Sequence, residues 1–233
     1  SIDTFLRHEE IDSVVIVCPE GWIKIIQKEY PNCKVVKGGL TRKDSSFNGL
    51  KACSKNTKNV LIHDAARPFI DKDIISRCLF ALEKYKAVDT VISSSDTIVE
   101  AKKNIITNMP IRDNMFLGQT PQAFDFKTIL KAHKQFKGKT TDDIRIAKKS
   151  NIKCCTIEGS VYNFKLTNQP DIYLAERITQ IQGQKEANVP KFTNKNVLIF
   201  GGTGGIGSGI GNLLKKLGAK VQLLGSEIDL RAN

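Results

Sequence analysis

The sequence lacks the cysteine and histidine spacings that build zinc sites and disulfide frameworks. Its six cysteines stand at positions 18, 33, 53, 78, 154 and 155, with no CxxC pair and no Cys/His ligand spacing. Cys18, Cys53 and Cys78 fall within apolar patterns and are expected to be small core residues, while Cys154 and Cys155 are expected on opposite faces of a strand. The sequence therefore predicts neither a disulfide nor a metal-ligand set of its own.

The sequence also lacks a signal peptide, a long apolar run and a dense basic block. The first two absences predict a cytoplasmic protein without a membrane partner. Lysine and arginine exceed aspartate and glutamate by 36 to 24, for a net charge of +12, but the basic residues are scattered and not interleaved with aromatic ones. This pattern favours small phosphorylated partners over nucleic acid.

What is present is an alternation of strand and helix patterns over most of the chain. It predicts an α/β fold with a Rossmann-like, mostly parallel sheet. The expected strands are 13–17, 33–36, 60–62, 90–93, 154–158 and 164–167, and the expected helices are 22–29, 45–53, 71–85, 127–136, one opened at 141–143, and 171–180. The patterns of Asp96–Val99 and Ile105–Thr107 indicate a β-hairpin that projects from the body as an arm over 96–115.

The most informative segment is Val60–Pro68, where a short apolar run ends in His63-Asp64-Ala65-Ala66-Arg67-Pro68. The run predicts a buried strand, and polar residues after such a strand lie where open α/β sheets bind ligands. Asp64 can hold a metal-bound phosphate or a ligand hydroxyl, and Arg67 can bind a phosphate through two hydrogen bonds. The alternative is an ordinary ion pair between Asp64 and Arg67.

A second segment, Gly38–Ser45, has the features of a ligand-binding turn. Gly38 and Gly39 follow a predicted strand and allow the backbone to approach a flat ligand. A helix expected to begin at Ser45 offers free N–H groups to an anion. Taken alone, the segment fits a simple strand–turn–helix joint equally well.

These two segments occur together with further motifs: Asp96-Thr97, Arg112, Gln119-Thr120-Pro121-Gln122, Thr141-Asp142 and Lys165-Leu166-Thr167. In order and spacing, over roughly residues 1–178, the chain resembles the sugar-alcohol-phosphate cytidylyltransferases. These include the methylerythritol-phosphate and ribitol-5-phosphate cytidylyltransferases. The resemblance implies an enzyme, a nucleotidyltransferase, with its domain over residues 1–180.

The resemblance also implies a set of site residues. Three are implied to be catalytic: Asp64, Arg67 and Lys165. The nucleotide would contact Gly38, Gly39, Ser45, Asp64, Ala65 and Lys165, and the acceptor would contact Arg67, Thr97, Arg112, Thr120 and Thr141. Thr97 and Arg112 stand on the arm, which implies a homodimer in which they reach the neighbouring subunit's site. A solvated lysine, ordinary packing of Thr97 and Thr120, and a solvated Arg112 remain the alternatives.

In the implied reaction, a phosphate oxygen of the acceptor attacks the α-phosphorus of CTP and pyrophosphate leaves. Positioning and charge stabilisation dominate such a step, with Lys165 facing the α-phosphate and Mg²⁺ bridging the triphosphate. The family begins with a strand and a Gly-rich loop that no segment before Ser1 supplies, so we expect a sheet without its first strand and low activity for this chain. Leu40 also stands where many relatives carry an acid.

A second Gly-rich segment follows an expected linker at 181–196. A strand at 197–200, then Gly201, Gly205 and Gly207, a helix and a strand at 220–224 indicate a dinucleotide-binding β–α–β unit. It resembles the start of a short-chain dehydrogenase/reductase domain over 197–233, which implies NADP(H) as a possible cofactor. The unit is too short for a core of its own, and a partly ordered remnant is the alternative.

With these two resemblances in one chain, the sequence resembles the bifunctional CDP-ribitol synthases. They imply ribitol 5-phosphate as the acceptor, with CDP-ribitol and pyrophosphate as products. Methylerythritol 4-phosphate, the acceptor in isoprenoid synthesis, is the alternative substrate. An NADP-dependent ribulose-5-phosphate reductase fragment and an inactive dimerising remnant are the remaining alternatives.

Overall fold

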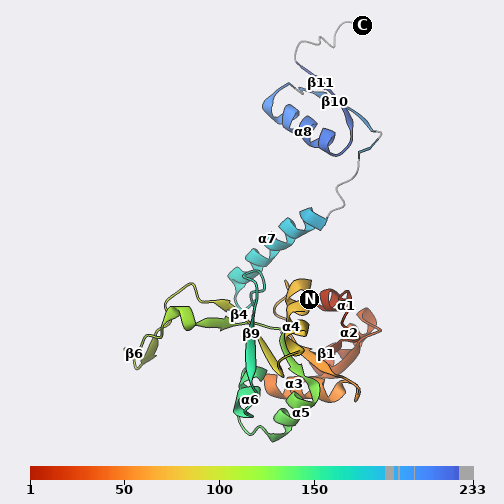
Figure 1. Cartoon of the computed structure of the whole chain (residues 1–233). Coiled ribbons are helices and arrows are strands. Elements are labelled where there is room, and N and C mark those ends of the chain that lie inside the picture. Colours follow the sequence, from red (N-terminus) through yellow and green to blue (C-terminus); the bar gives the residue numbers. More distant parts are fainter. Residues whose placement is uncertain (187–191, 194, 202, 226–233) are drawn as a thin grey trace. The chain divides into compact units, whose positions relative to one another are not determined.

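The computed structural model describes the chain except residues 187–191, 194, 202 and 226–233 (Figure 1). The chain divides into two compact units, Ser1–Thr167 and Asn168–Asn233, which are described separately. The first unit holds the predicted nucleotide site and the arm.

The central sheet of the first unit has five strands. In the order β3 (Asn59–Ile62), β8 (Gln122–Asp125), β4 (Ala87–Ser93) and β7 (Phe116–Gly118), neighbours are hydrogen-bonded, and β9 (Cys154–Glu158) pairs with β4. β3, β4 and β9 run in one direction, and β7 and β8 run against them. β1 (Val15–Cys18) and β2 (Lys34–Lys37) form a separate parallel pair. The expected α/β fold with a mostly parallel sheet is confirmed, although β7 and β8 were not predicted as strands.

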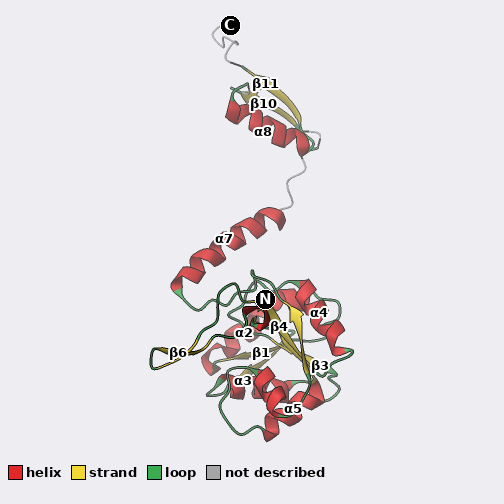
Figure 2. Ribbon diagram, turned by 60° about the vertical axis from the view of Figure 1, so that its left-hand side comes forward, coloured by secondary structure: helices red, strands yellow, loops and turns green. Residues whose placement is uncertain are grey.

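Helices cover both faces of this sheet (Figure 2). α3 (Arg42–Ala52), α5 (Phe126–Gln135) and α6 (Asp143–Lys149) lie on one face, and α1 (Ile2–Leu6) and α4 (Lys72–Leu82) lie on the other. The turn η1 (Glu20–Trp22) leads into α2 (Ile23–Glu29), which packs on β2. This layering leaves the ends of the strands free to carry functional loops.

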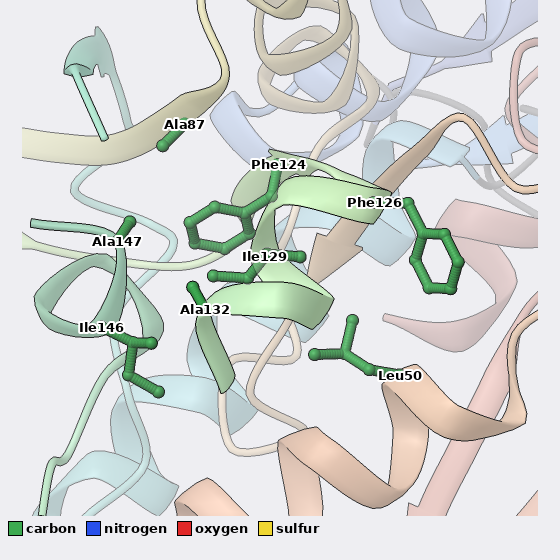
Figure 3. Close-up of a cluster of buried hydrophobic side chains, with 8 residues drawn as sticks. All are labelled: Leu50, Ala87, Phe124, Phe126, Ile129, Ala132, Ile146 and Ala147. Atoms are coloured by element: carbon green, nitrogen blue, oxygen red, sulfur yellow. The ribbon is translucent and has the colours of Figure 1, made fainter. Parts of the chain in front are cut away.

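The alternation of side chains along the strands separates two cores. On the α5 face, Phe124 and Ile129 are almost completely buried among residues of α3, α5 and α6 (Figure 3). Each such side chain contributes about 1.5–3 kcal/mol through burial. On the opposite face, Val88 and Cys78 form another cluster. Cys154 packs against the first cluster and Cys155 against the second, so their predicted placement on opposite faces of a strand is confirmed.

Side-chain caps define the starts of several helices, among them α3, α4 and α6. Asp71 accepts a hydrogen bond from the Ile74 amide at 2.8 Å, as predicted for a cap of α4, and Asp142 caps α6. The prediction that a helix begins at Ser45 was wrong by one turn. Thr41 and Asp44 form a reciprocal capping box, so α3 begins at Arg42 and Ser45 lies inside it.

The predicted hairpin is present and projects from the body of the unit (Figure 1). Its strands are β5 (Glu100–Lys102) and β6 (Ile105–Asn108), and the turn residues Lys103 and Asn104 have φ angles of 50° and 65°. Residues 96–99 are not a strand, because the turn places the pairing strand directly before Lys103. Arg112 follows in a short 3₁₀ turn, η2 (Arg112–Asn114).

The predicted strand at 164–167 is absent, and this expectation was wrong. The segment is held in irregular form by a hydrogen bond from the Leu166 amide to the Ala66 carbonyl at 2.8 Å and by stacking of Phe164 on Phe69. Lys165 therefore lies on a loop packed over the segment that follows β3.

The second unit contains α7 (Gln169–Glu186), β10 (Asn196–Phe200), α8 (Gly205–Lys216) and β11 (Lys220–Leu224). α7 begins two residues before and ends six residues after the predicted helix at 171–180, so the expected linker at 181–196 begins inside it. The parallel pair β10–β11 and the intervening α8 match the predicted β–α–β order. Gly201 has a φ of +70°, which suits glycine at the turn after β10.

None of the helices in the described part of the chain is long and apolar enough to span a bilayer.

Candidate active site

Asp64 is the central residue of the candidate site. It follows β3, and its side chain is mostly buried, with a relative exposure of 19%. Lys165 Nζ lies 2.8 Å from Asp64 Oδ2, and Arg42 Nε lies 3.2 Å from Asp64 Oδ1. Two cations from distant parts of the sequence therefore share one carboxylate, and the predicted pair Asp64 and Lys165 is brought together.

These contacts decide the charge of Asp64. Burial alone would raise the pKa of this carboxyl, but the hydrogen bond from Lys165 and the charge of Arg42 outweigh it and hold the pKa below its ordinary value. The alternative of an ion pair between Asp64 and Arg67 is not realised, because Arg67 bonds to carbonyl groups instead. Asp64 is an ionised carboxylate at neutral pH.

Thr120 positions Asp64 through its backbone amide. The Asp64 amide donates to Thr120 Oγ1 at 3.0 Å, and this hydroxyl lies 3.1 Å from His63 Nδ1. His63 Nε2 lies 2.9 Å from the Arg67 carbonyl, so a neutral ring protonated on Nε2 satisfies every contact. Burial lowers the pKa of His63 to about 4. The acceptor-binding role of Thr120 stays a prediction, since its hydroxyl serves this network.

Arg67 is also fixed by its surroundings. Its Nη1 donates to the Asn163 carbonyl at 2.7 Å and its Nη2 to the Gly118 carbonyl at 3.2 Å, while its buried Nε has no partner in the described part of the chain. Burial lowers the pKa of Arg67. A guanidinium whose hydrogen bonds go to neutral carbonyls, and which meets the charge of Asp64 only through space, suits the predicted contact with an acceptor phosphate.

The glycine turn lies beside this cluster at the start of α3. The Gly39 amide donates to Ser45 Oγ at 3.0 Å, and a Cβ atom on Gly39 would lie 2.2 Å from the Asp44 Cβ. Only glycine fits there. Leu40 is fully exposed. The turn thus presents backbone at the predicted nucleotide-binding residues Gly38, Gly39 and Ser45, whose contacts with a nucleotide stay predictions.

Other predicted site residues are exposed and stand apart. Ala65 and Thr141 are exposed, the latter directly before the α6 cap. Thr97 and Arg112 on the arm are exposed too, and in the described chain neither bonds to the cluster around Asp64; Arg112 Nε approaches only Asp113, at 4.0 Å. One chain therefore does not bring the arm residues into the site.

Sequence reasoning missed the residues behind Asp64. Arg42 also donates to Asp143, which is fully buried and contacts His133, and Gln122 accepts from the Asp143 amide at 2.9 Å. Asp143 looks like an ordinary residue of a capping run in the sequence. Only the spacing Thr41-x-x-Asp44 signalled that a helix begins early enough to place Arg42 at its first position.

The described residues include no group of three or more histidine, cysteine or acidic side chains that could hold a metal. The sequence predicted no metal-ligand set made by protein side chains alone. A metal could still be held in another way, by one carboxylate together with the phosphate groups of a bound nucleotide. Asp64, ionised and partly accessible, fits that part.

In the second unit, Gly201 lies between β10 and α8, Gly205 and Gly207 lie in the first turn of α8, and the N-terminus of α8 is capped by Gly204 without a side-chain hydrogen bond. A Cβ on Gly211 would lie 2.7 Å from a Leu223 methyl group, so α8 packs closely on the strands. Dinucleotide binding by this unit stays a prediction, and Glu227, which stands at about the sequence spacing expected of a ribose-binding acid, lies outside the described residues.

The chain is similar to known proteins in sequence and in fold. A family model described as 2-C-methyl-D-erythritol 4-phosphate cytidylyltransferase matches residues 1–180. A relative of that name from Clostridium botulinum (strain Loch Maree / Type A3) is 38% identical over 190 residues, which cover 77% of this chain and 83% of the relative. The ribitol-5-phosphate cytidylyltransferase of Lactiplantibacillus plantarum is 31% identical over 195 residues, covering 77% and 84%.

The fold is similar to that of a solved structure. The 4-diphosphocytidyl-2C-methyl-D-erythritol synthase of Anaerococcus prevotii DSM 20548 superposes with a TM-score of 0.73 at 33% identity, over 77% of this chain and 83% of that one. Relatives of two acceptor specificities thus align with the same part of this chain.

Proposed function

The chain belongs to the 2-C-methyl-D-erythritol 4-phosphate cytidylyltransferase family of nucleotidyltransferases, and from that premise we propose that it transfers CMP from CTP to ribitol 5-phosphate. A phosphate oxygen of the acceptor forms a bond to the α-phosphorus of CTP, the bond to the β-phosphate oxygen breaks, and pyrophosphate leaves. CDP-ribitol is the other product.

The observation that carries this proposal is the contact of Lys165 with Asp64 beside Arg67, which bonds to no carboxylate in the described part of the chain. Lys165 is a partly exposed cation that can neutralise charge developing on the α-phosphate. Arg67 holds an anionic acceptor, and the Gly39 turn lets the base approach backbone. The chain thus supplies position and charge, which are what phosphoryl transfer requires.

Mg²⁺ is the metal that this chemistry favours. Asp64 would hold it together with the triphosphate oxygens, and the ion would neutralise phosphate charge when bound. The remaining residues act without it: Thr120 fixes the Asp64 amide, and Arg42 holds one carboxylate oxygen.

Ribitol 5-phosphate is favoured over methylerythritol 4-phosphate by the second unit. The β10–α8–β11 order supports the reductase-like unit predicted over 197–233, which would belong to an enzyme that also makes its polyol phosphate by reduction, with NADP(H). The relative from Lactiplantibacillus plantarum named for ribitol 5-phosphate supports the same acceptor. Titration of the chain with NADPH tests the second unit separately, by the fluorescence of the bound nicotinamide.

The arm at 96–115 is proposed to form a homodimer. Its apolar side chains Ile105, Ile106, Met109 and Ile111 are 57–71% exposed, and Thr97 and Arg112 lie on the same segment. In a dimer these two residues would reach the partner's acceptor site.

The six free cysteines agree with a reducing, cytoplasmic location.

The decisive experiment is pyrophosphate release from CTP and Mg²⁺ with ribitol 5-phosphate and methylerythritol 4-phosphate in parallel reactions. We expect turnover with ribitol 5-phosphate and at least about tenfold less with the other acceptor, a difference of about 1.4 kcal/mol in the barrier. Turnover only with methylerythritol 4-phosphate would reassign the acceptor. An absence of turnover and of CTP binding would overturn the proposed activity of this chain.

A further inference from the structure

Asp143 is a buried carboxylate for which the proposed reaction gives no use. It is the first residue of α6 and is completely inaccessible to solvent. Arg42 Nη1 donates to its Oδ2 at 2.6 Å, His133 Nε2 lies 2.9 Å from its Oδ1, and Ser46 Oγ donates to Oδ2 at 3.3 Å. A buried charge persists only with such partners, and their number here points to a specific role.

Arg42 connects this carboxylate to the candidate site. Its guanidinium contacts Asp143 through Nη1 and Asp64 through Nε, so one planar group bridges two carboxylates. Lys165, Asp64, Arg42 and Asp143 therefore form a row of alternating charges that begins at the surface and ends in the core. Arginine suits this position because its fork presents separate donors in fixed directions.

The two cations on Asp64 are held very differently. The Lys165 side chain is 43% exposed, and Asp64 is its one polar partner in the described part of the chain. Arg42 is 26% exposed and is anchored by the buried Asp143. Moving Lys165 away from Asp64 breaks one exposed contact, whereas moving Arg42 would leave the buried Asp143 carboxylate without its guanidinium, with the His133 and Ser46 contacts remaining.

The support around His133 reinforces this anchor. His133 is buried and stacks on Phe47 of α3, with ring centroids 5.8 Å apart and an interplanar angle of 5°. Its Nδ1 has no partner in the described residues, so the ring donates one hydrogen bond, from Nε2 to Asp143. The start of α6 is fixed in addition by Gln122, which accepts from the Asp143 and Ile144 amides.

We propose that Asp143 is a positioning residue for nucleotide transfer, which anchors Arg42 on Asp64 so that Lys165 is the partner that leaves Asp64 for the substrate. This inference rests on the proposed function for its catalytic consequence but not for its structural content. When Lys165 turns to the α-phosphate, Arg42 keeps Asp64 compensated and oriented.

The structural content is tested first, without any substrate. Hydrogen exchange of the Arg42 Nε–H group is followed by ¹H–¹⁵N NMR in the full chain. We expect slow exchange in the unaltered chain and in Lys165→Met, and exchange at least about tenfold faster in Asp143→Asn. Slow exchange in Asp143→Asn, or fast exchange in Lys165→Met, would overturn the proposal.

A second variant guards against simple loss of folding. Arg42→Lys retains the charge but cannot bridge two carboxylates, and its partial exposure makes it tolerable in the fold. Ile129→Val is the matched control. It loosens the buried apolar cluster formed by residues of α3, α5 and α6, without changing a residue of the charged row. The control is expected to leave Arg42 exchange unchanged.

The catalytic consequence is measured by pyrophosphate release. For both Asp143→Asn and Arg42→Lys we expect kcat to fall about ten- to hundredfold, with less than about a threefold change in KM for CTP, as for other groups that orient a ligand-binding side chain. Equal losses in the Ile129→Val control would mean a merely structural role. If the unaltered chain shows no turnover, the proposed function fails while the exchange experiment still decides the anchoring.

Discussion

The Asp64 network and the arm are two parts of one unit that are stabilised in opposite ways. Around Asp64, charged groups from β3, α3, α6 and the 164–167 loop satisfy one another within the chain. On the arm, a two-stranded hairpin leaves its isoleucines more than half exposed. In the proposed function, a ligand replaces one contact of the first region, that of Lys165 with Asp64. In the proposed dimer, a second copy of the chain buries the apolar surface of the arm. A small hairpin alone is marginal in water.

The largest expected effect comes from removing Lys165, the cation of the network that we propose meets the substrate. Lys165→Met should lower kcat for pyrophosphate release about 10²–10³-fold, as for loss of one group that stabilises a transition-state charge. The exposed Lys153→Met serves as control and should retain activity, because Lys153 lies over the Tyr85 ring and is not among the partners of Asp64, Arg42 or Asp143 in the described part of the chain. Activity within about threefold of the unaltered chain in Lys165→Met would remove Lys165 from the reaction.

A second way to sharpen the comparison is the pH dependence of stability, because the network contains a buried histidine and the arm does not. The pKa of His63 is about 4 in the folded chain and about 6.5 when unfolded. Between these values the unfolded chain binds a proton that the folded chain does not, so His63 lowers the free energy of unfolding by about 3 kcal/mol as the pH falls from about 6.5 to 4.

Asp89 acts in the opposite sense over nearly the same range, because burial raises its pKa to about 6. The test is therefore a difference, from urea unfolding of the unaltered chain and of His63→Asn at pH 7 and pH 5. We expect the unaltered chain to lose more stability than His63→Asn on acidification. Equal losses would show that His63 is protonated as easily in the folded chain as in the unfolded one.

The glycine turn offers a smaller effect on the rigid side of the comparison. Gly39→Ala would force a Cβ atom against Asp44, both its side chain and its backbone, and should lower the free energy of unfolding by about 1–3 kcal/mol. Gly21→Ala is the control, because nothing lies within 4 Å of its added Cβ. Equal stability of the two variants in urea unfolding would mean that the turn adapts freely.

The arm should show the smallest effect on stability and yet a clear effect on assembly. Changing Ile105 and Ile106 together to lysine should alter the free energy of unfolding of the monomer by less than about 0.5 kcal/mol, since both side chains are exposed. Sedimentation should show a shift from dimer to monomer. A dimer that survives the change would place the interface elsewhere.

Much of this fold was predictable from local patterns. The strand before Asp64, the cap at Asp71 and the hairpin before Lys103 follow from apolar periodicity, a capping residue and a turn between branched residues. β8 was not predictable, because its polar Gln122 is buried only through bonds to Asp89 and to the start of α6. The strand expected at 164–167 failed for the converse reason: its apolar side chains pack on Phe69 and the Ala66 segment without a strand partner.

The candidate site divides in the same way. Asp64, Lys165 and the glycine turn could be named from their motifs, because a strand end and a glycine pair carry their meaning in a few adjacent residues. Arg42 and Asp143 could not, since they are 101 positions apart and their meeting depends on how α3 and α6 pack on one face of the sheet. By itself the sequence determined the family and the α/β alternation, and it predicted the residues of a nucleotide site. The tertiary structure alone decided which of the two cations on Asp64 also contacts a buried carboxylate, because the burial of a charge is a property of packing and not of sequence position.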